Sequence, residues 1–225
     1  MLIYGKQTVL HFLEQHPKRI KRLIFSKEID KKLFSKISKL NIPIERRDAK
    51  GAQGMAKGGN HQGFLAEVEE LELSSLDDLK DKNFLLLLSS LSDMGNIGAL
   101  IRTSLALGVD GVIIGGIKDI KSENLARSSS GAIFDIPIVH QPNLLDCMNE
   151  LKQSSFSFYG ATLDGEDIKS VTPMGKRALV LGSEGEGLSN KITSRLDYRV
   201  TIPMANRFDS LNVSAAGAIL IHRMS

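Results

Sequence analysis

From residue 83 onward, short apolar runs alternate with segments whose apolar residues recur every three to four positions. The apolar runs are typical of strands buried in a sheet, and the periodic segments are typical of amphipathic helices. Their regular alternation predicts an α/β fold with a parallel sheet covered by helices on both faces. The expected strands are 84–88, 111–114, 156–161, 178–181 and 198–202, and the expected helices are 97–107, 123–130, 143–152, 190–196 and 212–223.

The first 70 residues carry a shorter pattern of the same kind. Helical periodicity is present at about 7–14 and 31–40, and strand-like segments are present at 22–25, 41–44 and 63–68. Residues 51–60 hold four glycines and no apolar periodicity, so we expect a mobile loop there. The pattern predicts a small α/β domain at 1–70, a linker at 71–82 and a larger domain at 83–225.

The single cysteine and the short apolar runs bear on the compartment. Cys147 has no second cysteine to pair with, so we expect a small apolar side chain in a helix and a reducing, cytoplasmic environment. The longest apolar run, at 84–88, is far shorter than the about 20 residues that cross a bilayer. Residues 1–6 lack the basic start of a signal peptide. We therefore expect no membrane partner.

Positive charge is concentrated near the N-terminus. Residues 1–63 hold 14 Lys and Arg against 5 Asp and Glu, a net of +9, whereas residues 64–225 have a net of −6. A phosphate backbone favours such clusters, because each neutralised phosphate releases condensed counterions. A solvated basic face is the alternative. The clusters are Lys18-Arg19, Lys21-Arg22, Lys31-Lys32, Lys36, Lys39 and Arg46-Arg47.

The glycine-rich segment at 182–187 follows an apolar strand-like run, and Ser189 is placed to cap a following helix. Its spacing, G-x-x-G-x-G, is the reverse of the dinucleotide fingerprint, and Glu184 and Glu186 would repel a pyrophosphate. No Lys-Ser or Lys-Thr pair follows, as a P-loop requires. The segment suits a ligand without phosphate, such as S-adenosylmethionine with its sulfonium cation. A tight connection that binds nothing is the alternative.

Other catalytic constellations find no support in the sequence. The five histidines and Cys147 have no metal-ligand spacing, so no metal is expected. No G-x-S-x-G elbow is present. Glu184 and Glu186, two apart on a turn, are not placed to flank a sugar as glycosidase carboxylates do.

Three sequence blocks, taken together, resemble the motifs of the SpoU (TrmH) branch of the SPOUT RNA 2′-O-ribose methyltransferases. The blocks are NIGALIRT at 96–103, LGSEGEGL at 181–188, and IPM at 202–204 followed by SLNVS at 210–214. The segments IYG at 3–5 and HQG at 61–63 are similar to the subgroup that methylates guanosine in large-subunit ribosomal RNA. The resemblance thus covers nearly the whole chain.

The resemblance implies a parallel sheet whose C-terminal segment forms a deep trefoil knot, a homodimer, and an N-terminal RNA-binding domain like ribosomal protein L30. It also implies a set of site residues. Those for binding S-adenosylmethionine are Thr162, Gly182, Ile202, Met204 and Leu211, and the catalytic ones are Arg102, Asn96, Glu184, Ser210 and Asn212.

The activity implied is methyl transfer from S-adenosylmethionine to a guanosine 2′-hydroxyl in 23S ribosomal RNA. The alternatives are a transfer RNA ribose methyltransferase and a non-catalytic RNA-binding factor of ribosome assembly. Arg102 is the family's usual base, but a guanidinium is effectively always protonated. It could equally orient a phosphate and stabilise the developing alkoxide. For Asn96 and Asn212, helix capping is the structural alternative.

Overall fold

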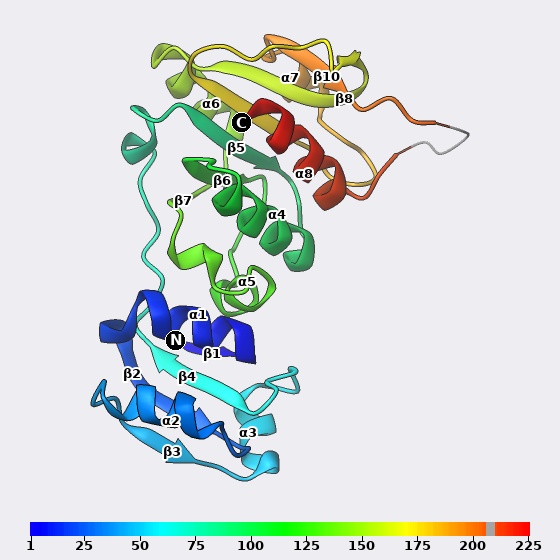
Figure 1. Ribbon diagram of the computed structural model, residues 1–225. Helices are drawn as coiled ribbons and strands as arrows, with labels where there is room; N and C mark the ends of the chain where they lie inside the picture. The colour runs from blue at the N-terminus through cyan, green and yellow to red at the C-terminus, as the bar shows by residue number, and fades with distance from the viewer. Residues whose placement is uncertain (206–209) are drawn as a thin grey trace.

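The computed structural model describes residues 1–205 and 210–225, and these form two α/β domains in sequence (Figure 1). The small N-terminal domain contains β1 (Leu2–Tyr4), α1 (Lys6–Gln15), a 3-10 turn (Pro17–Arg19), β2 (Ile20–Phe25), α2 (Lys31–Ser38), β3 (Ile44–Arg46), α3 (Ala49–Met55) and β4 (Phe64–Val68). Its strand order is β1-β4-β2-β3, with β4 antiparallel to β1 and β2, and β3 parallel to β2.

Strand periodicity divides the core of the small domain between the two faces of its sheet. Leu23 and Phe25 pack in the same cluster as Phe12 of α1 and Ile37 of α2. The residue between them, Ile24, points the other way and packs with Ala52 of α3 and Leu65 of β4. The sheet is therefore covered on both faces.

The expectation of a mobile loop at 51–60 is wrong for its first half, because α3 covers Ala49–Met55. Two local features offset the low helix propensity of the glycines. The Asp48 side chain caps the helix by accepting a hydrogen bond from the Gly51 amide at 3.1 Å. Ala52 and Ala56 are buried against the sheet, where larger side chains would not fit as closely.

The larger domain contains a six-stranded sheet of order β10-β8-β9-β5-β6-β7, in which every pairing is parallel. This confirms the parallel sheet. Its elements are β5 (Phe84–Ser89), α4 (Met94–Ala106), β6 (Gly111–Gly115), α5 (Ser122–Ser128), a 3-10 turn (Ala132–Phe134), β7 (Ile138–Gln141), α6 (Leu144–Gln153), β8 (Ser157–Asp167), β9 (Arg177–Leu181), α7 (Asn190–Thr193), β10 (Tyr198–Thr201) and α8 (Val213–Met224). A further 3-10 turn (Asp77–Leu79) precedes β5.

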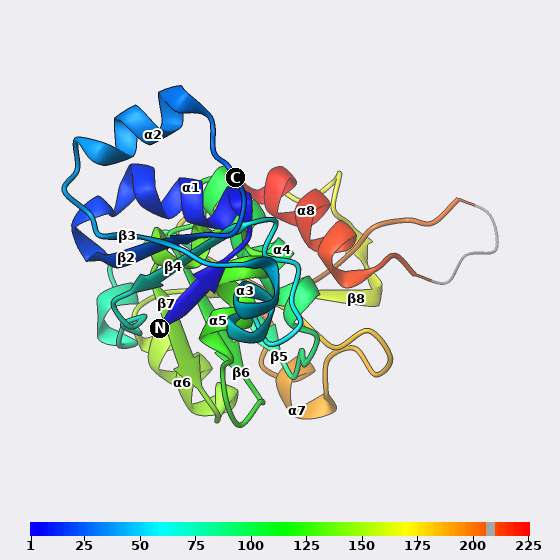
Figure 2. The same ribbon diagram turned by 90° about the horizontal axis from the view of Figure 1, so that it is seen from below.

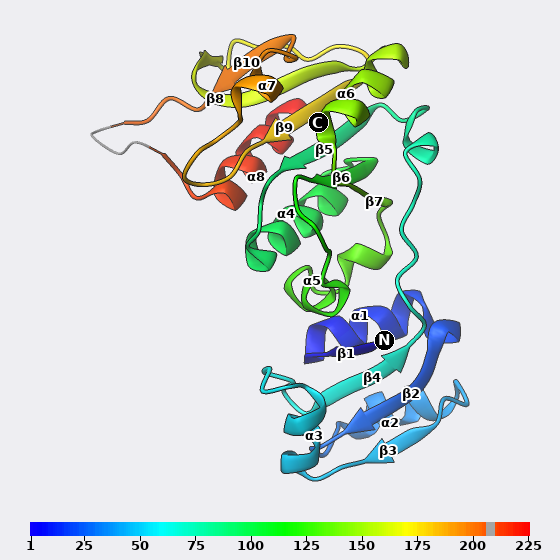
Figure 3. The same ribbon diagram turned by 180° about the vertical axis from the view of Figure 1, so that it is seen from behind.

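Helices cover both faces of the large sheet. Leu86 and Leu88 of β5 pack in one cluster with residues of α4 and α8, on the face turned to the viewer in Figure 1. Leu85 and Leu87 pack with Cys147 of α6 on the opposite face, which is seen in Figure 3. A Cβ on Gly217 of α8 would lie 2.3 Å from Leu100 of α4, so glycine lets these two helices approach closely.

In the large domain, two strands differ from the sequence prediction. β7 was not predicted, because its short apolar segment lies between Pro137 and Pro142 and occupies an edge of the sheet. β8 extends to Asp167, beyond the expected end at 161, since Glu166 and Asp167 pair with Val200 and Thr201 of β10. The second half of β8 is polar, so it lacks the apolar run that is typical of a buried strand.

The two domains meet where α1 and β1 lie against α5 and the 3-10 turn Ala132–Phe134 (Figures 1 and 3). Figure 2 shows the molecule from below, with the two domains overlapping in the view. The rings of Phe12 and Phe134 contact edge to face, with centroids 4.7 Å apart. Within residues 1–205 and 210–225, no helix combines the length and apolar character needed to cross a membrane.

Candidate active site

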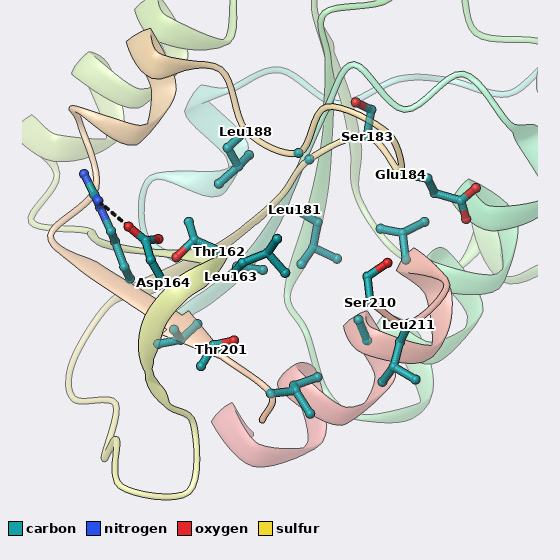
Figure 4. Close-up of a pocket in the computed structure, with 18 of the residues that line it drawn as sticks. Thr162, Leu163, Asp164, Leu181, Ser183, Glu184, Leu188, Thr201, Ser210 and Leu211 are labelled. Carbon is teal, nitrogen blue, oxygen red and sulfur yellow. Dashed lines mark hydrogen bonds and ion pairs between the residues drawn. The ribbon is translucent and has the colours of Figure 1, made fainter. Parts of the chain in front are cut away.

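A cavity of about 650 Å³ opens beside β8 and the carboxyl ends of β9 and β10, next to the start of α8 (Figure 4). Ligands of parallel α/β sheets bind at this end of the strands. Seven of the ten residues expected in the site line this cavity: Thr162, Gly182, Glu184, Ile202, Met204, Ser210 and Leu211. Residues of the second and third sequence blocks therefore line one cavity, together with Thr162 of β8.

The 182–187 loop forms one wall of the cavity as a tight turn. Ser183 and Gly187 pair across it, with the Gly187 amide donating to the Ser183 carbonyl at 3.0 Å. Gly187 adopts φ 64°, and a Cβ on Gly182 would lie 2.2 Å from the Gly187 carbonyl. Ser189 caps α7, as expected, by accepting from the Ile192 amide. The turn leaves no room for a side chain at 182.

Glu184 lies at one end of the cavity and accepts hydrogen bonds from two asparagines. Its Oε1 is 2.9 Å from Asn96 Nδ2 and 2.5 Å from Asn212 Nδ2. Asn212 Nδ2 also lies 3.1 Å from Asn96 Oδ1. The three side chains come from α4, the glycine loop and the start of α8, so one polar network joins the three sequence blocks.

The two asparagines differ in their backbone roles. Asn212 caps α8, with Oδ1 accepting from the Ser214 amide at 2.9 Å. The cap of α4 is Asp93, which accepts from the Asn96 amide at 2.7 Å. Capping therefore explains Asn212 in part and does not explain Asn96, whose side chain is held by Glu184.

Arg102 lies outside this arrangement, on α4 and away from the residues that line the large cavity. Its Nη1 donates to Ser130 Oγ at 3.4 Å. It lines a second cavity of about 280 Å³ at the junction of the domains, with Gln7 and His11 of α1 among its neighbours. Residues 206–209, between the two parts of the third block, lie outside the described residues.

A second charged group lies at the other end of the large cavity and was not predicted. Asp164 of β8 and Arg199 of β10 form an ion pair of 3.0 Å there (Figure 4). The neighbouring Thr162 hydroxyl is the main cause that keeps the pKa of Asp164 below its usual value, and Arg199 adds to it. Only strand register brings Asp164 and Arg199 together, and the sequence pattern does not give that register.

The cavity fits S-adenosylmethionine by size and by the chemistry of its walls. Leu181, Leu188 and Leu211 offer apolar surface for an adenine, and Glu184 offers negative charge for a sulfonium. Thr162 also lines the cavity, and its hydroxyl lies beside the Asp164 carboxylate. Two carboxylates on the loop disfavour a phosphate ligand.

Cys147 belongs to the core of the large domain, as expected. It is fully buried in α6, and this burial, with a smaller effect of Glu150, raises the pKa of the thiol to about 12. No group of three His, Cys, Asp or Glu residues in 1–205 and 210–225 is arranged to hold a metal ion.

The fold and site define an α/β protein with a cavity of cofactor size between the glycine turn and the start of a C-terminal helix. Residues 83–222 match the SpoU rRNA methylase family, and residues 2–74 match the substrate-binding domain of RNA 2′-O ribose methyltransferases. The chain belongs to the SpoU family of RNA ribose 2′-O-methyltransferases.

Relatives align along nearly the whole chain. A TrmH family tRNA/rRNA methyltransferase of Bacillus subtilis is 30% identical over 99% of this chain and 94% of its own length. A 23S rRNA (guanosine-2′-O-)-methyltransferase, RlmB, of Haemophilus ducreyi is 32% identical over 97% of this chain and 94% of its own.

Solved structures share the fold. The AdoMet-bound rRNA methyltransferase of Sinorhizobium meliloti has a TM-score of 0.80 at 22% identity. The match covers 99% of this chain and 85% of the Sinorhizobium chain. The AdoMet complex of the SpoU methyltransferase AviRb of Streptomyces viridochromogenes has a TM-score of 0.79 at 24% identity, covering 99% and 88%.

Proposed function

We propose that this protein methylates the ribose 2′-hydroxyl of a guanosine in 23S ribosomal RNA, in the cytoplasm, with S-adenosylmethionine as the donor. The observation that carries the proposal is the network of Asn96, Glu184 and Asn212 at one end of a cavity of cofactor size. The guanosine and 23S assignments draw support from the Haemophilus relative, which bears that activity in its name.

When bound, the cofactor would supply a methyl carbon on a positively charged sulfur: the ribose 2′-oxygen would bond to this carbon and lose its proton, and the neutral thioether would leave. In the proposed site, Thr162, Gly182, Ile202, Met204 and Leu211 bind the cofactor. The residues at the Glu184 end of the cavity, which are Asn96, Glu184, Ser210 and Asn212, position the reacting oxygen. Two amide hydrogen bonds fix the Glu184 carboxylate, so it needs no reorganisation when the substrate binds. Ser210, at the same cavity, is a further hydrogen-bonding group for the ribose.

The role proposed for Arg102 is to hold an RNA phosphate and stabilise the developing alkoxide, since its guanidinium remains protonated. Arg102 does not line the cofactor cavity of its own subunit. We therefore propose a homodimer in which it reaches the partner's site. The half-exposed apolar side chains of Leu211 and Ile219, 40% and 43% exposed, support a partner surface beside that cavity.

The small domain, residues 1–70, is proposed to bind the RNA. Several of its cations are already neutralised: Arg22 pairs with Glu45 and Glu67, and Arg47 also pairs with Glu45. Lys31 and Lys32, at the start of α2, are exposed and form no ion pair with a residue of the described chain. They are better candidates for phosphate contacts than Arg47.

The test is transfer of labelled methyl to ribosomal RNA transcribed in vitro, with transfer RNA in a parallel reaction. Incorporation into ribosomal RNA that is lost in Asn212→Ala supports the proposal. Incorporation only into transfer RNA would identify transfer RNA as the substrate, which the name of the Bacillus relative also includes. No heat of cofactor binding in calorimetry, together with no transfer to either RNA, would favour a non-catalytic role in ribosome assembly.

A further inference from the structure

One carboxylate of the large domain holds two histidines of the small domain. Asp135 follows the 3-10 turn Ala132–Phe134, and its Oδ1 is 2.6 Å from Nε2 of His16. Its Oδ2 is hydrogen-bonded to Nε2 of His11 on α1, five residues earlier in the chain. A carboxylate only accepts hydrogen bonds, so both imidazoles donate from Nε2. The Asp135 side chain is 17% exposed, so the loss of these donors would leave a largely buried charge unpaired.

Aromatic contacts hold the same junction together. Phe12 of α1 lies edge to face with Phe134, the residue before Asp135, and the guanidinium of Arg19 lies 5.9 Å from both ring centroids. The position of α1 is thereby fixed against the turn that carries Asp135.

The segment between α5 and this turn connects the junction to Arg102. Ser130 and Gly131 adopt φ 55° and 95°, left-handed conformations that need support when the residue is not glycine. A Cβ on Gly131 would lie 2.7 Å from Cδ2 of His11, so α1 rests directly on this segment. On its other side, Ser130 Oγ accepts from Nη1 of Arg102. Arg102 and His11 also line the same cavity of about 280 Å³.

We propose that Asp135 is a positioning residue that acts through Arg102. Docking of His11 and His16 on Asp135 holds Ser130 in the conformation that orients the Arg102 guanidinium. The small domain thus contributes to the orientation of the arginine as well as to RNA binding. The inference rests on the catalytic role proposed for Arg102, but its structural part can be tested without RNA.

The structural test is a nitrogen-15 spectrum of the arginine side chains in the full chain. The Arg102 signal is identified by its loss in Arg102→Lys. We expect Asp135→Asn and His11→Gln each to shift or broaden it, because each removes part of the contact. Glu14→Gln, on the same helix but paired with Lys36, should leave it in place. An unchanged Arg102 signal in either folded variant would overturn the inference. If Asp135→Asn does not fold, His11→Gln alone provides the test.

The kinetic test separates this inference from the proposed function. Asp135→Asn should lower kcat about tenfold, as expected for a misplaced catalytic group, while the calorimetric affinity for S-adenosylmethionine stays unchanged. In an Arg102→Lys background the same change should cost less than about twofold, because the two effects are not independent. Fully additive losses would overturn the coupling. If the unaltered protein transfers no methyl group, the proposed function is wrong. The nitrogen-15 spectrum would still show whether Asp135 orients Arg102.

Discussion

Asn96 and Asn212, 116 positions apart in the chain, lie with Nδ2 of Asn212 3.1 Å from Oδ1 of Asn96, and both donate to Oε1 of Glu184. Two amides around one carboxylate oxygen fix its position while preserving its charge. The proposed chemistry needs such an arrangement, because a preorganised charge stabilises a transition state without reorganisation. A network with no role beyond joining α4 to α8 would not need a cavity beside it.

Glu184→Gln tests the charge of the network. The substitution keeps the side-chain length and one acceptor oxygen, so Asn96 and Asn212 retain a partner. We expect methyl transfer to fall about 100-fold, the usual effect of removing one preorganised electrostatic group. The midpoint of thermal unfolding should change little, because Glu184 is exposed. Steady-state kinetics with Asp81→Asn as a control carboxylate would check this, and equal rates in both variants would contradict the role.

Gly182→Ala tests the shape of the cofactor wall. The new Cβ would lie 2.2 Å from the Gly187 carbonyl, so the turn must open. We expect a loss of about 1–3 kcal/mol in the free energy of unfolding, together with weaker cofactor binding. Gly185→Ala is the matched control, because a Cβ there meets no atom within 4 Å. Urea unfolding and calorimetry would measure both effects, and equal stability of the two variants would contradict the packing argument.

Cys147 should be unreactive in the native protein at mildly alkaline pH. Burial is the main cause that raises the pKa of its thiol to about 12, with Glu150 second, so the nucleophilic thiolate is scarce below that pH. A thiol reagent at pH 8 should modify it only after denaturant is added. Rapid stoichiometric modification of the native protein would mean that α6 opens readily.

Salt dependence of RNA binding tests the lysines of the small domain. Lys31→Gln with Lys32→Gln should lower the slope of log affinity against log salt by about 1.5, close to one phosphate contact per lysine. Arg47→Gln should change the slope less, because Glu45 already pairs with Arg47. Filter binding over a range of salt concentrations would measure both, and equal changes in slope would contradict the assignment.

The sequence predicted the larger fold well where periodicity is strong. The apolar strand at 84–88 and the amphipathic segments around it lie where expected, since burial on both faces leaves a clear pattern. Weaker signals failed for local reasons. A side-chain cap and buried alanines formed α3 in a glycine-rich segment, and flanking prolines obscured β7. The trefoil knot depends on how the chain is threaded, which periodicity does not report, and it stays a prediction.

For the site, the sequence named most of the residues but not all of their relations. The motif blocks brought Gly182, Ile202 and Leu211 to one cavity, as expected. They did not reveal that Arg102 lies at the domain junction. The sequence of a helix does not show which distant part of the chain packs against it. Asp164 and Arg199 were missed for the same reason, since they meet only through strand pairing.

Mapping of ribose methylation in ribosomal RNA decides whether this protein methylates a guanosine of 23S RNA. Unmodified 23S RNA would be incubated with S-adenosylmethionine and the protein, then read for 2′-O-methylation at every nucleotide, with Asn212→Ala alongside. We expect a methylated guanosine with the unaltered protein and a strongly reduced signal with the variant. Methylation confined to a base or to transfer RNA, or an unchanged signal in Asn212→Ala, would contradict it.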